Sequence, residues 1–389
     1  MRTRVAIVGG GPAGLLLGQA LHLANIDNVI VERRSREHVL SRVRAGVLEH
    51  GLTELMRRLG VAARLDAEGL VHDGVVIAAA GQRLHLDLRG LAGGSVTIYG
   101  QTELTRDLYD ARDGWGGLVH HEAEDVTIDG IDGRQPSLSF VAAGHRRVVA
   151  CDFVVGCDGF HGICRRAMPA GVLQTFERRY PFGWLGVLTP TPPVHPELIY
   201  ATHEDGFALC SMRRPQLSRY YVQCSLDDSV DDWPLERFWD TLRDRLPREV
   251  ASALVTGPAS EMSIAPLRSF VAEPMRHGRL FLAGDAAHIV PPTGAKGLNL
   301  AAADVGRLAN AFAAWYLNGV DDGLSRYSDD ALRRVWLVER FSWWLTNLLH
   351  RFPDQNDFGH RMQQAELDHL WRSTAAQTAF AENYVGLPF

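Results

Sequence analysis

The sequence predicts an α/β fold: a Rossmann-like nucleotide-binding domain, an inserted antiparallel-sheet domain and a C-terminal helical region. Residues 4–34 read as strand, glycine-rich turn, helix and strand. Residues 175–268 alternate apolar and polar positions between turns, as half-buried antiparallel strands do. From residue 328 onward, apolar side chains recur at helical spacing.

Composition excludes several classes of protein. The chain has 389 residues, 46% of them hydrophobic and 22% charged, which predicts a globular protein with a sizeable core. A formal net charge of -6 disfavours nucleic acid as a partner. Five cysteines without a CxxC pair argue against a disulfide framework and favour a reduced, cytoplasmic compartment. No apolar run reaches roughly 18 residues, so we expect no membrane span.

The first strand leads into a glycine-rich turn, GGGPAG, in which Gly9, Gly11 and Gly14 have GxGxxG spacing. The first glycine permits the tight turn, the second lets the backbone approach a pyrophosphate, and the third lets helix and strand pack closely. Glu32 ends the second strand, where it is placed to accept hydrogen bonds from ribose hydroxyls. These residues predict an ADP-containing dinucleotide, with FAD and NAD equally compatible.

Two further strand ends favour FAD. The segment CDFVVGCDGFHGICRR ends its strand at Asp158, and RLFLA is followed by GDAAHIVPPTGAKGLN with Asp285. Ligands collect at the carboxyl ends of strands in open α/β sheets, so three such ends predict one extended ligand. Asp285 suits a ribityl chain, and the helix starting near Lys296 aims its N–H groups at an electron-rich ring. The alternative is that Asp285 caps the helix and the prolines end a strand.

The middle segment carries hydroxyls and arginines close together. Strand alternation places Ser211 and Arg213 on one face, with Tyr221 on a nearby strand. Arg213 is suited to pair with a carboxylate while Ser211 and Tyr221 donate hydrogen bonds. An ordinary strand surface with solvated arginines explains the same residues equally well.

GGGPAG with Glu32, GCDGFHGICRR and GDAAHIVPPTGAKGLN resemble the three signatures of the single-component FAD-dependent aromatic hydroxylases. The resemblance runs along the whole chain and includes SRVRAGVLE, IYGQTEL, YPFGWLG, SRYYVQ, SIAPLRSF and RFSWWLT. We expect an FAD-binding domain at 1–174, completed by 267–320. A substrate-binding sheet domain is expected at 175–266, and a helical interface region at 321–389.

The resemblance implies hydroxylation of 4-hydroxybenzoate to 3,4-dihydroxybenzoate. A nicotinamide cofactor would reduce FAD, and dioxygen would then form a flavin hydroperoxide. Tyr200 would contact the phenol oxygen, Tyr384 would contact Tyr200, and His72 would pass the proton to solvent. The backbone carbonyl of Pro292 would face the substrate hydroxyl. Taken alone, His72 is a strand-edge histidine, and Tyr384 lies in a C-terminal tail of the kind that normally frays.

The resemblance also assigns binding positions. The implied substrate contacts are Tyr200, Ser211, Met212, Arg213, Tyr221 and Pro292. The implied FAD contacts are Gly9, Gly11, Ala13, Gly14, Glu32, Arg33, Arg42, Val43, Arg44, Ala45, Gly46, Val47, Gln101, Asp158, Arg219, Asp285, Lys296, Gly297, Leu298 and Asn299. The implied nicotinamide contacts are Arg33, His38, Arg44, His161, Arg165 and Arg268. Ala13 and Met212 depart from the family pattern, and no metal site is expected.

The nicotinamide cofactor is predicted to be NADPH, with NADH as the alternative. Arg33, Arg34 and Arg36 would favour a 2′-phosphate, although a solvated basic helix also explains Arg34 and Arg36. No second Rossmann motif is visible for this cofactor.

The C-terminal part predicts a long helix that begins at an N-cap, Ser328, and stops at Phe352-Pro353. Its apolar stripe fits either a core helix or a subunit contact. The resemblance favours a homodimer.

Three other functions remain open at this point. The first is hydroxylation of another para-substituted benzoate such as 4-aminobenzoate, which Arg213 and Tyr200 do not exclude. The second is a flavin- or nucleotide-binding regulator without turnover, which has no need of the set Tyr200, Pro292 and Tyr384. The third is an NAD-dependent dehydrogenase, for which the sequence lacks hydride-transfer residues.

Overall fold

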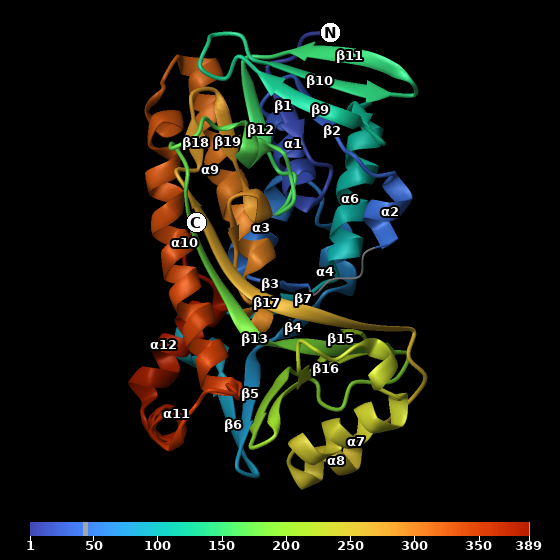
Figure 1. The fold of residues 1–389 in the computed structure, drawn as a ribbon, viewed down its shortest axis with the longest axis vertical. Helices are drawn as coiled ribbons and strands as arrows, with labels where there is room; N and C mark the ends of the chain where they lie inside the picture. Colours follow the sequence, from blue (N-terminus) through green and yellow to red (C-terminus); the bar gives the residue numbers. More distant parts are fainter. Residues whose placement is uncertain (42–45, 389) are drawn as a thin grey trace.

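The computed structural model describes residues 1–41 and 46–388 (Figure 1). At its centre is a sheet in the order β18-β19-β12-β1-β2-β8, parallel except for the pairing of β18 with β19. Its strands are β1 (Val5–Val8), β2 (Asn28–Val31), β8 (Val119–His120), β12 (Phe153–Gly156), β18 (Arg276–His277) and β19 (Leu280–Leu282). Strands β1, β2 and β12 are buried along their whole length, as parallel strands covered on both faces should be.

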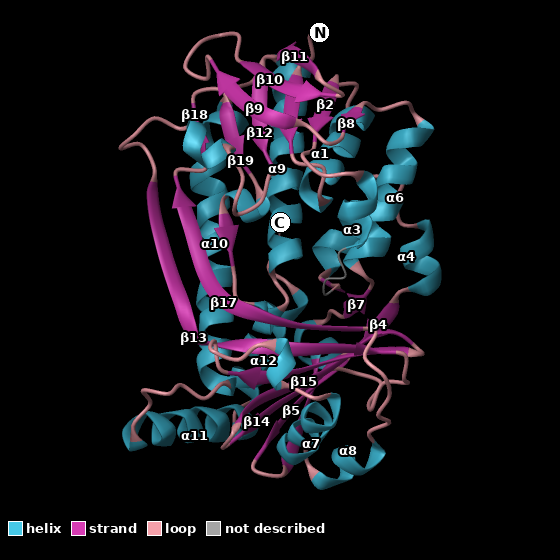
Figure 2. Ribbon diagram, turned by 45° about the vertical axis from the view of Figure 1, so that its right-hand side comes forward, coloured by secondary structure: helices cyan, strands magenta, loops and turns pink. Residues whose placement is uncertain are grey.

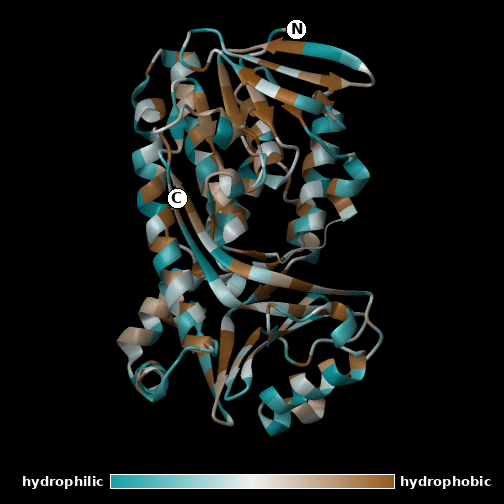
Figure 3. Ribbon diagram, in the orientation of Figure 1, coloured by the Kyte–Doolittle hydropathy of each residue, from teal (hydrophilic) through white to brown (hydrophobic). Residues whose placement is uncertain are grey.

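Helices pack around this sheet. Helix α1 (Pro12–Leu23) lies against α6 (Gln101–Gly114) and against α9 (Gly297–Asn318), which in turn packs on α10 (Asp322–Leu349). Hydropathy colouring shows the central strands as mainly apolar (Figure 3). A small antiparallel sheet, drawn at the top of Figure 1, follows the order β11-β10-β9. Its strands are β9 (Glu124–Asp129), β10 (Ser137–Ala142) and β11 (His145–Ala150).

A second large sheet has the order β20-β17-β13-β16-β15-β14-β5-β6. Two long antiparallel strands, β13 and β17, run from beside the parallel sheet into this one (Figure 2). The sheet is antiparallel except for the parallel pairing of β14 with β5. Its strands are β5 (Gly74–Ala79), β6 (Gln82–Asp87), β13 (Gln174–Thr189), β14 (Ile199–His203), β15 (Gly206–Arg214), β16 (Leu217–Cys224), β17 (Glu261–Glu273) and β20 (His288–Ile289).

The predicted α/β fold class is confirmed, with one addition. Strands β5 and β6 come from residues 74–87, which the sequence placed with the nucleotide-binding part, yet they complete the antiparallel sheet. The division of the chain into domains at 174, 266 and 320 stays a prediction.

Alternation along the large sheet separates two buried faces. Tyr220 packs against Trp239 of α7 (Leu235–Arg245), on the face that α7 covers. Tyr221, one residue later, points to the opposite face, which lies against the C-terminal helices. This second face carries the candidate active site.

The remaining elements complete the frame. A short antiparallel sheet contains β3 (Val47–Leu48), β7 (Val96–Ile98) and β4 (Leu70–His72). The other helices are α2 (Arg36–Ser41), α3 (His50–Arg58), α4 (Ala63–Glu68), α5 (Leu88–Ala92), α8 (Arg248–Ala253), α11 (Asp357–Arg372) and α12 (Thr374–Val385). Within the described ranges, no helix has the length and apolar character needed to cross a bilayer.

The long C-terminal helix differs from the prediction at both ends. Helix α10 begins at Asp322, a turn and a half before Ser328, and ends at Leu349. Ser328 is therefore not an N-cap. Its hydroxyl instead accepts a hydrogen bond from the Met275 backbone N–H at 2.9 Å, a contact that residues nearby in sequence do not reveal. Val335 and Leu345, from the predicted apolar stripe, are fully buried.

Candidate active site

The glycine-rich turn fits a pyrophosphate. A Cβ on Gly9, whose φ is +109°, would lie 2.2 Å from the Cys157 carbonyl oxygen. A Cβ on Gly14 would lie 2.0 Å from the Gly9 carbonyl oxygen. These two glycines are required by the protein's own packing. A Cβ on Gly11 meets no atom within 4 Å, so Gly11 borders open space in front of the N-terminus of α1.

Substitution of Gly11 by alanine therefore separates cofactor binding from folding. Gly11 has φ -78°, which alanine adopts without strain, and the added methyl group meets no protein atom. We expect Gly11→Ala to leave the thermal stability of the FAD-free protein unchanged. FAD binding should weaken by about 1–3 kcal/mol, the usual cost of overpacking a close contact. Fluorescence titration with FAD and thermal melts check this, with Gly9→Ala as the variant that loses folding stability itself.

Glu32 holds the same turn together. One of its carboxylate oxygens accepts a hydrogen bond from the Gly10 N–H at 2.7 Å, and the other accepts from the Arg34 N–H at 2.8 Å. Each oxygen retains a second lone pair for a ribose hydroxyl. Glu32 thus sets the geometry of the turn as well as offering the acceptor that the sequence predicts.

The sheet order brings the strand ends of the three motifs into one row. Strands β19, β12, β1 and β2 are neighbours and parallel, so Asp285, Asp158, Gly9 and Glu32 lie along the same edge. Asp158 accepts a hydrogen bond from the Cys164 N–H at 2.9 Å through one oxygen. Its other oxygen is buried and has no hydrogen-bond partner among the described residues. A row of turns with an unpaired acceptor fits an extended, hydroxyl-bearing ligand such as FAD.

The turn before α9 presents backbone rather than side chains. The Asn299 amide donates to the Val47 carbonyl at 2.9 Å, and its oxygen accepts from the Glu49 N–H at 2.9 Å. The Lys296 amine donates to Glu49 at 2.8 Å and to the Tyr384 carbonyl at 2.7 Å. These side chains are committed within the protein, so the first-turn N–H groups of α9 are what remains for a flavin ring.

The other predicted FAD contacts differ in how crowded their surroundings are. A Cβ on Gly297 would approach only Val290, at 4.0 Å, whereas one on Gly46 would lie 1.7 Å from the Tyr99 carbonyl oxygen. Leu298 is partly exposed in the first turn of α9, and Gln101 begins α6. The predicted contacts Arg42, Val43, Arg44 and Ala45 lie outside the described residues.

Strand register gathers the predicted substrate residues on one face. Tyr200 pairs with Leu209, Leu209 with Tyr221, and Tyr221 with Gly186 on the next strand. Paired residues of a sheet share a face, so Tyr200 and Tyr221 point the same way. A Cβ on Gly186 would lie 2.7 Å from the Tyr221 ring, which shows that glycine leaves room for that ring. Ser211 pairs with Arg219 on this same face.

Arg213 is a cation of this face without a carboxylate partner among the described residues. Its guanidinium donates to the Met212 carbonyl at 3.0 Å and to the Tyr221 hydroxyl at 3.5 Å, and its Nε is buried without a partner. It forms no ion pair with any described residue, and burial lowers its pKa. Arg213 also lines a cavity of about 90 Å³ together with Gly100 and Glu103. A partly buried cation that lacks a carboxylate partner favours an anionic ligand.

The neighbouring predicted residues have their own contacts. The Ser211 hydroxyl donates to the Arg219 carbonyl at 2.8 Å, and Met212 is buried in the same cluster as Tyr200. The Arg219 guanidinium pairs with Glu261 at 3.0 Å and lies over the Tyr221 ring, so in this structure it organises the sheet face.

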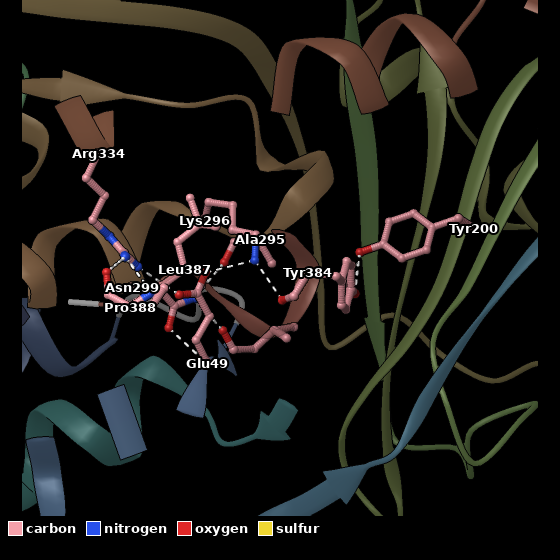
Figure 4. A network of polar contacts seen from close by, with 10 residues as sticks. Glu49, Tyr200, Ala295, Lys296, Asn299, Arg334, Tyr384, Leu387 and Pro388 are labelled. Atoms are coloured by element: carbon pink, nitrogen blue, oxygen red, sulfur yellow. Dashed lines mark hydrogen bonds and ion pairs between the residues drawn. The ribbon is translucent and has the colours of Figure 1, made fainter. Parts of the chain in front are cut away.

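Tyr200 and Tyr384 are brought together from distant parts of the chain. Their hydroxyl oxygens are 2.9 Å apart, and each residue is 1% exposed (Figure 4). Burial raises the pKa of Tyr200 to about 12 and raises that of Tyr384 well above its ordinary value. Both hydroxyls therefore keep their protons at neutral pH, and the pair forms a chain along which a proton can move by exchange.

His72 and Pro292 do not form hydrogen bonds with the Tyr200–Tyr384 pair. His72 is buried in β4 with neither ring nitrogen bonded to a described residue, and burial lowers its pKa to about 4. No hydrogen bond to Tyr384 is formed, so its relay role stays a prediction. Pro292 is exposed, and its carbonyl accepts a hydrogen bond from the Ala295 N–H at 2.9 Å.

His350 packs against the aromatic side chains of this sheet face. It was not identified from the sequence. Its Nε2 accepts a hydrogen bond from the Trp184 indole at 2.7 Å, and Nδ1 lies 2.9 Å from the Thr346 carbonyl, which requires a neutral ring. Its ring stacks on Phe182 and Phe207. Burial lowers the pKa of His350 to about 3.

This neutral histidine makes stability depend on pH. The unfolded chain binds a proton at His350 below about pH 6.5, whereas the folded chain does so only near pH 3. The stabilising contribution is complete above pH 6.5 and is lost as pH falls toward 3. Between pH 6 and pH 4, the wild type should lose about 1.4 kcal/mol per pH unit more than His350→Gln. Urea unfolding at several pH values measures this, and equal slopes would contradict it.

Three of the predicted nicotinamide contacts surround Phe160. Arg268 lies 4.4 Å and Arg165 4.9 Å from the centre of the Phe160 ring, and His161 meets that ring edge-on. Arg165 also donates to the Ala286 carbonyl at 2.8 Å, which ties this surface to the turn after β19. Arg33 is exposed shortly before α2, and His38 is exposed within that helix. Arg44 lies outside the described residues. Arg36 is engaged in ion pairs with Asp113 and Asp110.

Two ionic groups escaped the sequence analysis. Glu49 pairs with Lys296 at 2.8 Å and with Arg334 at 3.2 Å. His288 and Asp304 form a buried pair at 2.6 Å, and Asp304 also accepts from the Gly284 N–H. Glu49 lies within a segment that resembles the hydroxylases, but the residues around it in the sequence do not predict that Lys296 and Arg334 are its partners.

Comparison with known proteins decides the family. Residues 2–342 match the family described as FAD binding domain. The chain belongs to this FAD-binding family. This confirms FAD, rather than NAD, as the dinucleotide that the glycine-rich turn predicts.

Individual relatives of this flavoprotein are close in sequence or in fold. The chain is 53% identical to p-hydroxybenzoate hydroxylase of Acinetobacter baylyi over 100% of its length and 96% of that protein. It is 28% identical to 6-hydroxy-3-succinoylpyridine 3-monooxygenase of Pseudomonas putida, covering 95% of both chains. Its fold is similar to that of p-nitrophenol 4-monooxygenase from Pseudomonas putida, with a TM-score of 0.81, 19% identity and full coverage of both chains.

Proposed function

We propose that this flavoprotein is a monooxygenase that hydroxylates 4-hydroxybenzoate to 3,4-dihydroxybenzoate, using NADPH and dioxygen. The observation that carries the proposal is the Tyr200–Tyr384 pair, at 2.9 Å, on the same sheet face as Arg213. The 53% identity with p-hydroxybenzoate hydroxylase of Acinetobacter baylyi supports it along the whole chain. When bound, FAD supplies the hydride-accepting and dioxygen-activating chemistry that side chains lack.

Arg213 would bind the carboxylate of the substrate. Ser211 and Tyr221 would add hydrogen bonds, and the buried Met212 would border the ring. A carboxylate would balance the charge of the partly buried guanidinium, whose Nε has no partner among the described residues. A para-hydroxylated benzoate presents its phenol at the other end, toward Tyr200.

Tyr200 would activate the substrate ring by moving a proton. A free phenol ionises only near pH 10, so at neutral pH its ring is a weak nucleophile. Hydrogen bonding from Tyr200 to the phenolate would favour ionisation, and Tyr384 would take up the proton that Tyr200 exchanges. His72, neutral at pH 7, would pass it toward solvent. The Pro292 carbonyl would face the substrate hydroxyl.

The nicotinamide cofactor would bind at the arginines around Phe160 and along α2. His161, Arg165 and Arg268 share this surface, and Arg33 and His38 are exposed. Arg33 and Arg34 would favour a 2′-phosphate, so we propose NADPH rather than NADH.

The reaction is tested with purified, FAD-loaded protein in air. We would follow NADPH loss, 3,4-dihydroxybenzoate and hydrogen peroxide together, with 4-hydroxybenzoate and 4-aminobenzoate as parallel substrates. Matched NADPH loss and 3,4-dihydroxybenzoate formation supports the proposal. Peroxide without hydroxylated product from 4-hydroxybenzoate would overturn it. Product from 4-aminobenzoate alone would transfer the assignment to the amine.

We also propose a cytoplasmic homodimer. All five cysteines are free thiols, which suits a reducing compartment. Exposed apolar side chains along α10 and α11 support a subunit contact: Trp336, Leu337, Trp343, Phe358 and Met362. Light scattering on the purified protein measures the mass, and a monomer at micromolar concentration would contradict the dimer.

A further inference from the structure

The segment that carries Tyr384 lies at the very end of the chain, where most proteins fray. Helix α12 ends at Val385, leaving Gly386, Leu387 and Pro388 as the described tail. Yet Tyr384 is 1% exposed and its hydroxyl meets Tyr200 at 2.9 Å. Something other than chain connectivity must fix this position.

Two buried cations bind the backbone of this segment. The Lys296 amine donates to the Tyr384 carbonyl at 2.7 Å (Figure 4). The Arg334 guanidinium donates to the Leu387 carbonyl and, at 2.6 Å, to the Pro388 carbonyl. Arg334 belongs to α10 and Lys296 precedes α9, so the tail is held by two separate elements of the fold.

Glu49 joins the two cations. It is 2% exposed, and its carboxylate lies 2.8 Å from the Lys296 amine and 3.2 Å from the Arg334 guanidinium. A Cβ on Gly386, whose φ is +111°, would lie 2.2 Å from a Glu49 oxygen. The tail therefore lies directly on this carboxylate, and only a glycine permits that approach.

Charge explains why the tail is part of the network. The two buried cations share the Glu49 carboxylate, and each also directs N–H groups at the backbone of the tail. Carbonyl oxygens of the tail carry partial negative charge and are acceptors for these donors. Removing the tail would expose the cations to water, and removing a cation would release the tail.

We propose that Arg334 is a positioning residue that clamps the C-terminal tail so that Tyr384 stays in contact with Tyr200. Arg334 acts on the backbone beyond Tyr384, whereas the Tyr384 hydroxyl meets Tyr200. This inference rests on the proposed hydroxylation for its catalytic consequence. The clamp itself is testable without turnover.

Arg334→Gln is the principal variant, compared in FAD-loaded form with the wild type. Arg333→Gln is the matched control, because Arg333 is the adjacent residue of α10, 69% exposed at its side chain and paired with Asp330. Arg334→Lys retains the charge beside Glu49 but not the planar guanidinium that reaches both carbonyls. Tyr384→Phe serves as the reference for loss of the relay.

The first readout is hydrogen exchange of the peptide covering α12 and the tail, measured by mass spectrometry. We expect exchange to be about ten-fold faster in Arg334→Gln, intermediate in Arg334→Lys and unchanged in Arg333→Gln. Wild-type exchange in Arg334→Gln, or equal acceleration in Arg333→Gln, would overturn the clamp.

The second readout is 3,4-dihydroxybenzoate formed per NADPH oxidised. In Arg334→Gln we expect this yield to fall by about ten-fold while NADPH oxidation continues, since a misplaced proton-transfer group loses part of its roughly 10²–10⁴-fold contribution. Arg334→Lys should regain part of the yield. An unchanged yield with accelerated exchange would overturn the positioning role.

The two readouts keep this inference separate from the proposed function. If the wild type makes no 3,4-dihydroxybenzoate but exchange rises in Arg334→Gln and not in Arg333→Gln, the clamp stands and the proposed function fails. If Arg334→Gln does not accumulate as folded protein, deletion of residues 387–389 removes both carbonyl acceptors and leaves Arg334, Lys296 and Glu49 in place. That deletion should reproduce the exchange and yield changes, and wild-type values would overturn the clamp.

Discussion

Tyr384→Phe is expected to keep NADPH oxidation running while 3,4-dihydroxybenzoate gives way to hydrogen peroxide. The substitution removes one hydroxyl and leaves the Tyr200 hydroxyl, which is fully buried, without its 2.9 Å partner. Tyr200 would still contact the substrate but would have nowhere to pass its proton. Hydroxylation should fall by about 10²-fold, the lower end of the range for a positioned proton-transfer group.

Product, peroxide and NADPH are measured in one assay for this variant. Phenylalanine retains the ring, which stacks on Phe380, so thermal stability and FAD content should change little. Tyr327→Phe is a suitable control, since it removes another buried hydroxyl, one that donates to the Leu282 carbonyl away from Tyr200. Full product yield in Tyr384→Phe would exclude the relay.

Arg213→Gln is expected to weaken binding of 4-hydroxybenzoate by about 2–5 kcal/mol, the usual cost of truncating one partner of a buried charge pair. Arg213 lies on the Tyr200 face and, unlike Arg219, forms no ion pair with any described residue, so the substrate carboxylate would be its partner. Glutamine offers hydrogen bonds but no charge. FAD content should be unaffected.

A matched control and a neutral ligand sharpen this test. Arg214 is the next residue, 57% exposed at its side chain and paired with Glu103, and Arg214→Gln should bind substrate as the wild type does. 4-Hydroxybenzamide lacks the carboxylate, so its affinity should change far less in Arg213→Gln. Equal loss of affinity for the acid and the amide would show that Arg213 does not bind the carboxylate.

Local sequence accounts for the FAD-binding turn because its constraints act over a few residues. Gly9 requires a left-handed backbone and Gly14 a close backbone contact, and both demands are met within one strand–turn–helix unit. The strands that precede Asp158 and Asp285 were predicted in the same way, from apolar runs followed by glycine and aspartate. The parallel sheet places these ends in a row.

The start of α10 and the place of β5 and β6 were beyond such reasoning. Serine is a residue type favoured at helix N-caps, but the Ser328 hydroxyl accepts a hydrogen bond from the Met275 N–H, and the helix continues through Ser328. Strand β5 pairs with β14, far along the chain, and β6 pairs with β5 at the edge of the sheet. The sequence of residues 74–87 does not indicate that β14 is the partner of β5.

By itself, the sequence determined the α/β fold class and the FAD fingerprint, and through resemblance it predicted the roles of Tyr200 and Tyr384. Only the tertiary structure decided how Tyr384 is held, because Tyr200 and Tyr384 are 184 residues apart and Glu49 and Arg334 are 285 apart. Local patterns encode strands, helices and turns, since those depend on neighbours within a few residues. A buried ion network is fixed instead by which distant elements pack together, and by the cost of burying any charge that lacks a partner.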